Sequence, residues 1–446
     1  MKKVRAQEIF WPISGITLCV LSKIFFMPGE RFTNGQYLIA FYLIYTTFVL
    51  IYHKIKRFEA GPIRFSFFLI GVIFLLFSSP ILENDHYRYL WEGRVLFFGK
   101  NPYLFSPNSD VLNNIEYNAR NLIAYPKLTT VYPPLALLWF GAGGIISSNY
   151  KFGLIVLMIF NSVLAYIFLK KLQQFGVKTY QLVLIFPLIQ KEYIQAIHID
   201  FMASMFILPI LLTPRPNTMK VAIRGLTLIL ASIWSKLLGG IYLISYLFFT
   251  PTNIRKKHFY ILFALFCALS LPLFFLVFIK HFEVLSGAIA FSEKWIWNPG
   301  FYLILVKGLN IGRHFSRNIT FYSYLIYLLV IIIGILKYFK QNGSLNITLK
   351  NFHAITYLVF SGMMFFSPVF NSWYSIWFLV PALLIGINSG VFYAIFSVFS
   401  YSYYWNKDFI VMGSIINNLW FLISIVEIYK MLIQSKPNSI LRSKRQ

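Results

Sequence analysis

Carboxylates, arginines and aromatic rings gather in residues 83–94, within the length of one short helix. The spacing predicts a helix over residues 85–98 with Asn84 or Asp85 as its N-cap, because an Asx side chain can accept hydrogen bonds from the first free backbone amides. A carboxylate on such a helix could take the proton from an attacking hydroxyl, and an arginine could hold an oxyanion. Solvated loop charges are the competing interpretation. Residues three and four apart share a helix face, and one face would carry Asp85, Arg88, Tyr89 and Glu92.

Charged or polar residues also occur within or next to apolar runs at two later places, Lys236 and the pair His198 and Asp200. Lys236 lies in the middle of the apolar run 225–249, where an ammonium group is costly unless it faces a polar cavity or snorkels to the interface. We expect a helical hairpin whose turn brings this lysine to the outer face, where it could contact phosphate. His198 and Asp200 stand at the expected outer end of another helix. They could form a polar wall for a substrate, or they could simply cap the helix.

Lys191 and Glu192 are neighbours in the apolar segment 179–197. We expect them to pair with each other at a helix end, which is a structural role. Lys191 remains a further candidate for contact with phosphate.

The composition excludes an ordinary soluble protein. The chain has 446 residues, of which 58% are hydrophobic and only 12% are charged. Soluble domains carry about 25% charged residues, so this chain cannot cover a water-facing surface of several domains. Soluble enzymes, disordered proteins and nucleic-acid-binding domains are therefore poor interpretations. Apolar runs long enough to cross a bilayer recur along the chain, which predicts one all-α polytopic membrane domain over residues 1–446.

The sign of the charge orients this domain in the membrane. The 40 Lys and Arg residues outnumber the 14 Asp and Glu residues, which gives a net charge of +26. Short cytoplasmic loops carry an excess of Lys and Arg, so we expect the basic clusters and both termini on the cytoplasmic side of the cell (inner) membrane. That topology predicts about 12–14 transmembrane helices, one of them over residues 259–279. It leaves two outer segments, residues 83–148 with amphipathic and juxtamembrane helices, and residues 280–318.

Three strings in the first outer segment carry a resemblance to a known family. They are Asp85-His-Tyr-Arg-Tyr-Leu-Trp-Glu-Gly-Arg94, Gly99-Lys-Asn-Pro-Tyr103 and Val131-Tyr-Pro-Pro-Leu135. Together they resemble the first-loop signature of multi-span C-type (GT-C) glycosyltransferases, and most of all the bacterial mannosyltransferase-like branch. His198-Ile-Asp200, Lys236 in a hairpin and the element ending in Trp373-Tyr374 agree with that branch. Glu92 stands where the family has Asp, and Asn371-Ser372 replace its His-Pro.

The resemblance implies a GT-C-like fold and an inverting sugar transfer on the extracytoplasmic side, with mannose as the expected sugar. The donor would be linked to a polyprenyl phosphate, and the acceptor would be a lipid or a glycan. Asp85 would act as the general base, which agrees with its place just outside a span. The donor phosphate would contact Arg88, Arg94 and Lys236. The acceptor or the sugar would contact Tyr89, Glu92, His198, Asp200, Trp373 and Tyr374. No cofactor and no metal ligand is predicted, although a divalent cation is compatible with this chemistry, and no nucleic acid is expected as a partner.

Two other functions stay open on the sequence. A transporter or flippase for a lipid-linked sugar would place ionisable groups near the bilayer midplane, whereas the acids here cluster in outer segments. A polysaccharide polymerase or ligase would use a pyrophosphate-linked donor and would need no base at Asp85. Release of polyprenyl monophosphate from a lipid-linked donor would separate the glycosyltransferase from both alternatives.

Overall fold

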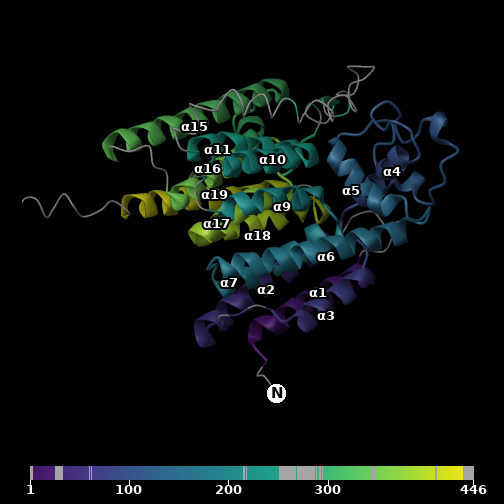
Figure 1. Ribbon diagram of the computed structural model, residues 1–446, viewed down its shortest axis with the longest axis horizontal. Coiled ribbons are helices and arrows are strands. Elements are labelled where there is room, and N and C mark those ends of the chain that lie inside the picture. Colours follow the sequence, from purple (N-terminus) through teal and green to yellow (C-terminus); the bar gives the residue numbers. More distant parts are fainter. Residues whose placement is uncertain are drawn as a thin grey trace, which may run out of the picture.

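Helices lying side by side form most of the structure, and a smaller layer of short helices and loops covers one end of them (Figure 1). The computed structural model describes residues 4–25, 34–59, 63–213, 218–250, 295–342, 348–406 and 409–434, with isolated positions between these ranges. Over these ranges the only β-structure is a single bridge between Trp297 and Val369. The expectation of an all-α protein is therefore confirmed.

The first three helices are apolar and lie together at one side of the bundle. They are α1 (Ala6–Ile24), α2 (Gly35–Lys56) and α3 (Phe65–Leu76). Glycines let α1 and α3 approach closely, since a Cβ on Gly15 would lie only 2.8 Å from the carbonyl oxygen of Gly71. α3 ends before Ser78 and Pro80, because proline lacks the amide that would continue the helix. The link that follows leads directly into residues 83–94.

The helix predicted over residues 85–98 is α4 (Asp85–Phe97), and it packs against the short helix α5 (Pro134–Gly144). Their backbones nearly touch, since a Cβ on Gly144 would lie 2.3 Å from the carbonyl oxygen of Leu90. With 11 residues, α5 is about 16 Å long, which is too short to cross a hydrocarbon core of about 30 Å.

α4 is more enclosed than a helix lying on a membrane surface. Almost every side chain from His86 to Val95 is buried, because α5, α6 and the loop between α4 and α5 cover it. That loop runs over residues 98–133 and contains two short 3₁₀ turns, η1 (Asp110–Leu112) and η2 (Arg120–Leu122). The polar groups of α4 therefore act inside the protein.

The next part of the chain contains a sharp break. The long helix α6 (Tyr150–Gln174) is followed by α7 (Thr179–Leu184), α8 (Phe186–Leu188), the π-helix η3 (Ile189–Gln195) and α9 (Ile199–Leu212). The axes on either side of residues 196–198 differ by 115°. His198 and Asp200 therefore lie at a helix end, as the sequence predicts.

The expected hairpin around Lys236 is confirmed. Its arms are α10 (Met219–Ser235) and α11 (Ile241–Phe249), joined by the 3₁₀ turn η4 (Leu237–Gly240). Lys236 is extended, with φ −153° and ψ 123°, and it ends α10. The far ends of the two arms are in contact, since the hydroxyl of Tyr246 in α11 donates a hydrogen bond of 3.2 Å to the carbonyl oxygen of Ala222 in α10.

The remaining helices pack around these elements or along their outside (Figure 1). They are α14 (Phe301–Leu303), the π-helix η6 (Ile304–Gly308), α15 (Arg313–Asn342), α16 (Leu349–Phe366), η7 (Ser372–Ser375), α17 (Ile376–Ile385), α18 (Asn388–Ile395), η8 (Phe396–Tyr404) and α19 (Phe409–Gln434). The span predicted over 259–279 lies almost wholly outside the described residues, as does the first part of the predicted outer segment 280–318.

Four described helices are long and apolar enough to cross a membrane, namely α2, α6, α15 and α19. The bent pair formed by residues 179–195 and α9 would add a fifth if it were one span. The chain is therefore an all-α polytopic membrane protein. The count of about 12–14 crossings stays a prediction.

Candidate active site

Buried and half-buried polar side chains from separate segments meet where α4, η3, the start of α9 and the turn after α10 come together. The segments are the link before α4, α4 itself, η3, the start of α9, the turn after α10, η7 and η8. The side chains are Glu83, Asp85, Tyr89, Lys191, Glu192, His198, Asp200, Lys236, Ser372, Trp373, Tyr374 and Tyr401. We call this set the polar cluster.

One half of the polar cluster is an ionic network around a buried lysine. The Nζ atom of Lys191 lies 3.1 Å from Oε2 of Glu192 and 3.5 Å from Oε1 of Glu83. The hydroxyl of Tyr401 donates to Glu83 at 2.5 Å and also contacts Lys191, while Ser372 donates to Glu192 at 2.5 Å. Buried charges persist when they are paired and hydrogen-bonded. The expected Lys191–Glu192 pair is thus confirmed as part of a larger network.

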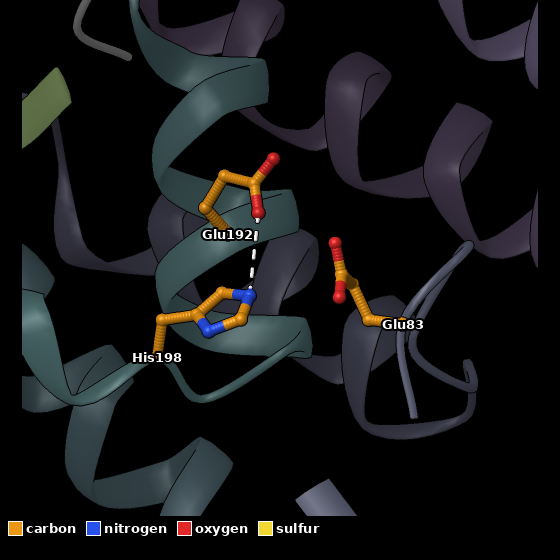
Figure 2. A group of neighbouring side chains, drawn as sticks. All are labelled: Glu83, Glu192 and His198. Atoms are coloured by element: carbon orange, nitrogen blue, oxygen red, sulfur yellow. Dashed lines mark ion pairs between the residues drawn. The ribbon is translucent and has the colours of Figure 1, made fainter. Parts of the chain in front are cut away.

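His198 connects this network to α4. Its Nδ1 atom lies 3.0 Å from the hydroxyl of Tyr89, and its Nε2 atom lies 3.6 Å from Oε2 of Glu192. The imidazole ring stacks on the indole of Trp373, with centroids 3.8 Å apart and planes 13° apart. Figure 2 shows Glu83, Glu192 and His198 pointing toward one another. The imidazole is therefore held at one nitrogen by a hydrogen bond and on one face by an aromatic ring.

The backbone is strained where it positions His198. Ile197 has φ +52°, a left-handed conformation that is a true outlier for a β-branched residue. The π-helix η3 precedes it, and π-helical turns are common at functional sites. Such strain persists only where the surrounding structure over-determines it, and here it orients the first residues of α9 toward the polar cluster.

The other half of the polar cluster surrounds Asp200. The indole Nε1 of Trp377 donates a hydrogen bond of 2.8 Å to Oδ1 of Asp200, and Nζ of Lys236 lies 3.4 Å from its Oδ2. The same ammonium lies 5.6 Å from the ring centroid of Tyr132 and 5.1 Å from that of Tyr374. The side chain of Lys236 keeps 18% of its surface exposed, whereas Asp200 is fully buried. Lys236 is therefore the cation of this half that a ligand can reach.

Asp85 begins α4 and lies beside both halves. Its Oδ2 atom is 3.5 Å from the hydroxyl of Tyr89. Burial raises the pKa of the Asp85 carboxyl, and the charges of Arg88, Lys236 and Lys191 oppose that shift. A carboxylate with a raised pKa is a better proton acceptor than a solvated one.

The pKa of Glu83, two residues earlier, is also shifted. Burial, together with the negative charges of Asp85 and Glu192, raises the pKa of its carboxyl to about 8, against the opposing charge of Lys191. Negative charge is therefore in excess around this part of the polar cluster.

Arg88 lies away from the centre of the polar cluster and holds the loop between α4 and α5. Its Nε donates to Glu92 at 2.6 Å, and its two terminal nitrogens donate to four carbonyl oxygens at residues 124–129. Glu92 in turn accepts a 2.5 Å hydrogen bond from Thr130. Arg88 and Glu92 therefore lie together on one face of α4, as predicted. All three guanidinium nitrogens of Arg88 already have acceptors within the protein.

Arg94 lies on the opposite face of α4. It donates to the carbonyl oxygen of Gly144 at 2.9 Å and stacks over the ring of Phe98. Of the four cations considered for contact with phosphate, Lys236 and Lys191 lie in the polar cluster, while the two arginines bind backbone oxygens. Among the residues predicted to contact acceptor or sugar, all but Glu92 lie in the polar cluster.

Three members of this environment were not singled out in the sequence, namely Glu83, Tyr401 and Trp377. Glu83 opens the charged stretch 83–94, so its place in the sequence was a usable signal. A second signal for a polar site was the pair of charges, Lys191 and Glu192, inside an apolar segment. Placing these charges there is as costly as placing Lys236 in its apolar run. Tyr401 and Trp377 lie in apolar aromatic runs without such a signal.

A comparison with protein families gives one match. Residues 26–250, about half of the chain, match the family model described as alpha-(1->6)-mannopyranosyltransferase, N-terminal domain. The matched region extends through α11 and includes Asp85, His198 and Lys236. No curated protein and no solved structure matches the chain.

Proposed function

Because the chain belongs to the alpha-(1->6)-mannopyranosyltransferase family and is a membrane glycosyltransferase that acts with mannose, we propose that it takes the mannosyl residue from a polyprenyl-phosphate donor. The acceptor is a hydroxyl of a lipid or glycan, and the reaction takes place on the extracytoplasmic side of the cell membrane. The termini then lie in the cytoplasm, as the basic clusters favour.

The proposed reaction inverts the anomeric carbon. The acceptor oxygen attacks this carbon while Asp85 accepts the hydroxyl proton. The bond between the anomeric carbon and the phosphate oxygen breaks, and polyprenyl monophosphate leaves with the bonding electrons. An inverting transfer that forms an alpha linkage needs a beta-linked donor.

One observation carries this proposal. The half-buried Asp85 carboxyl feels the charges of two ammonium groups, Lys236 and Lys191, as well as that of Arg88. The base is thus close to fixed cations, and fixed cations stabilise the charge that develops on a leaving phosphate. Lys236 is the cation assigned to the phosphate, because its side chain is the more exposed of the two.

The remaining proposed contacts follow from the same geometry. Tyr89 orients Asp85 through its hydroxyl, and Trp373 holds the ring of His198. The ring of Tyr374 lies against the ammonium of Lys236 and would border the sugar next to the phosphate. His198 and Asp200 would line the acceptor side. Arg88, Glu92 and Arg94 are assigned to support of the first outer loop.

The donor assay tests this function. The purified protein in lipid nanodiscs is given beta-linked polyprenyl-phosphate mannose, a nucleotide-linked mannose or a pyrophosphate-linked sugar, each with an unlabelled glycan acceptor. We expect polyprenyl monophosphate and an alpha-linked product from the first donor alone. Transfer from the nucleotide sugar, or movement of the lipid donor across the bilayer without release of monophosphate, would contradict the proposal.

A further inference from the structure

Three side chains in the polar cluster have the arrangement of metal ligands. Glu83, Glu192 and His198 each offer one ligand atom, and these atoms all lie within 4.8 Å of one another (Figure 2). The distance of 3.6 Å between Nε2 of His198 and Oε2 of Glu192 is close to the ~3.5 Å between two ligands of a tetrahedral ion bound at about 2.1 Å. The carboxylate of Glu83 lies within 4.8 Å of both atoms and would complete the set if its side chain moved toward them.

The imidazole supplies an independent observation. His198 is 1% exposed, and its Nε2 atom has no hydrogen-bond partner although it points at Glu192. Its other nitrogen is held by the hydroxyl of Tyr89, and its ring plane is fixed by Trp373. Metal-binding histidines are held in this way, with one nitrogen in an outer hydrogen bond and the other on the ion. A buried nitrogen left unpaired at such a position indicates a missing partner.

The charge balance indicates what that partner is. Among the described residues, the polar cluster holds four carboxylates, Glu83, Asp85, Glu192 and Asp200. It holds two ammonium groups, those of Lys191 and Lys236. Two positive charges are therefore lacking when all four acids are ionised, and buried charge without compensation is costly. A divalent cation would supply both.

We propose that Glu83, Glu192 and His198 bind one divalent transition-metal ion. Two carboxylate oxygens and one imidazole nitrogen suit ions such as Mn²⁺ or Zn²⁺, whereas Mg²⁺ and Ca²⁺ prefer oxygen ligands throughout. The role of this ion in transfer rests on the proposed function. The ion lies beside Asp85 and offsets the charge that the donor phosphate brings to an acidic site.

Lys191 competes with this ion. Its ammonium lies 3.1 Å from Glu192 and 3.5 Å from Glu83, on the same carboxylates that the ion would use. The ion can bind only when the ammonium moves away from them. Replacement of Lys191 by methionine, which is similar in length and uncharged, removes the competitor and should tighten binding.

The test is a Mn²⁺ titration of the purified full-length protein in nanodiscs, with free Mn²⁺ measured by electron paramagnetic resonance and Zn²⁺ added as a competitor. We expect one bound ion per chain, binding at least about tenfold weaker in Glu83→Gln and in His198→Ala, and tighter binding in Lys191→Met. Glu116→Gln changes an exposed glutamate of the first outer loop and should bind as the wild type does. Elution profile and unfolding temperature show which variants are folded.

Three results would overturn the metal site. The first is a wild type that binds neither ion, which needs no variant to interpret. The second is folded Glu83→Gln and His198→Ala that bind like Glu116→Gln, and the third is Lys191→Met that binds more weakly than the wild type. Each readout is taken without donor or acceptor. A protein that binds Mn²⁺ as described but does not use the lipid donor would leave the metal site standing and refute the proposed function alone.

Discussion

The hydroxyl of Tyr89 lies 3.0 Å from Nδ1 of His198, so α4 is hydrogen-bonded to the break that precedes α9. The same hydroxyl lies 3.5 Å from Oδ2 of Asp85. One phenol therefore links the proposed base to the imidazole beside Glu192. The ring of Tyr89 stacks on Phe140 of α5, with centroids 4.4 Å apart, which keeps the hydroxyl in place.

Tyr89→Phe should lower kcat for mannosyl transfer by about fivefold, because a lost hydrogen bond of about 1 kcal/mol no longer orients Asp85 and His198. The KM for the donor should change little, since no contact with the phosphate is removed. Tyr117→Phe is the matched control: it removes a 2.9 Å hydrogen bond to the carbonyl oxygen of Tyr87, outside the polar cluster. A steady-state comparison of the two variants checks this, and equal kcat values for them would contradict the positioning role.

Lys236→Met should destabilise the protein by about 3–5 kcal/mol, because it leaves the buried carboxylate of Asp200 without its ion pair. The double variant Lys236→Met/Asp200→Asn should recover most of the unfolding temperature, since neither charge is then left alone. It should not recover transfer, because the phosphate still lacks its cation. Thermal unfolding and transfer are measured on the same samples. A double variant with wild-type transfer would show that Lys236 has only a structural role.

Gly144→Ala should destabilise the contact between α4 and α5. The added Cβ would lie 2.3 Å from the carbonyl oxygen of Leu90 and 3.0 Å from the backbone nitrogen of Arg94, and backbone atoms cannot give way as a side chain can. Overpacking of this kind costs about 1–3 kcal/mol. Gly312→Ala is the control, because a Cβ there meets nothing within 4 Å. Thermal unfolding of both variants checks the prediction, and equal unfolding temperatures would refute the close contact.

His86 should make the protein sensitive to acid. Burial lowers the pKa of its imidazole to about 3, whereas the unfolded chain binds the proton at about pH 6.5. The unfolded state therefore gains a proton first as pH falls. By pH 5 the folded state should have lost about 2 kcal/mol of stability relative to pH 8 through this one residue.

His86→Gln removes that contribution, because glutamine does not titrate. Its unfolding temperature should fall less than that of the wild type between pH 8 and pH 5. Parallel pH dependences for the two proteins would show that His86 can be protonated in the folded state.

The sequence was informative where charge interrupts apolar runs. It predicted α4, the hairpin at Lys236 and the helix end at His198, because helical spacing and the cost of a charge in the membrane are local properties. It did not predict that Arg88 and Arg94 would bind carbonyl oxygens. Those partners come from the loop and from α5, and their distances depend on how α4 is packed.

The network around Lys191 shows a second limit. Lys191 and Glu192 are adjacent in sequence, so their pair was expected. Glu83 and Tyr401, which join them, lie 109 and 209 residues from Glu192, and no sequence spacing reveals such contacts. Helix ends that far apart meet only in the folded bundle. The same limit applies to the proposed metal site, because Glu83 lies 109 residues before Glu192 in the sequence.

The account rests on Asp85 as the general base, and Asp85→Asn tests it most directly. The variant keeps the size and the N-terminal place of the side chain in α4 but cannot accept the proton. With beta-linked polyprenyl-phosphate mannose, we predict that kcat falls by about 10²–10⁴ at an unchanged unfolding temperature, while the exposed control Asp110→Asn transfers normally. Folded Asp85→Asn with transfer within about threefold of the wild type would contradict the central claim.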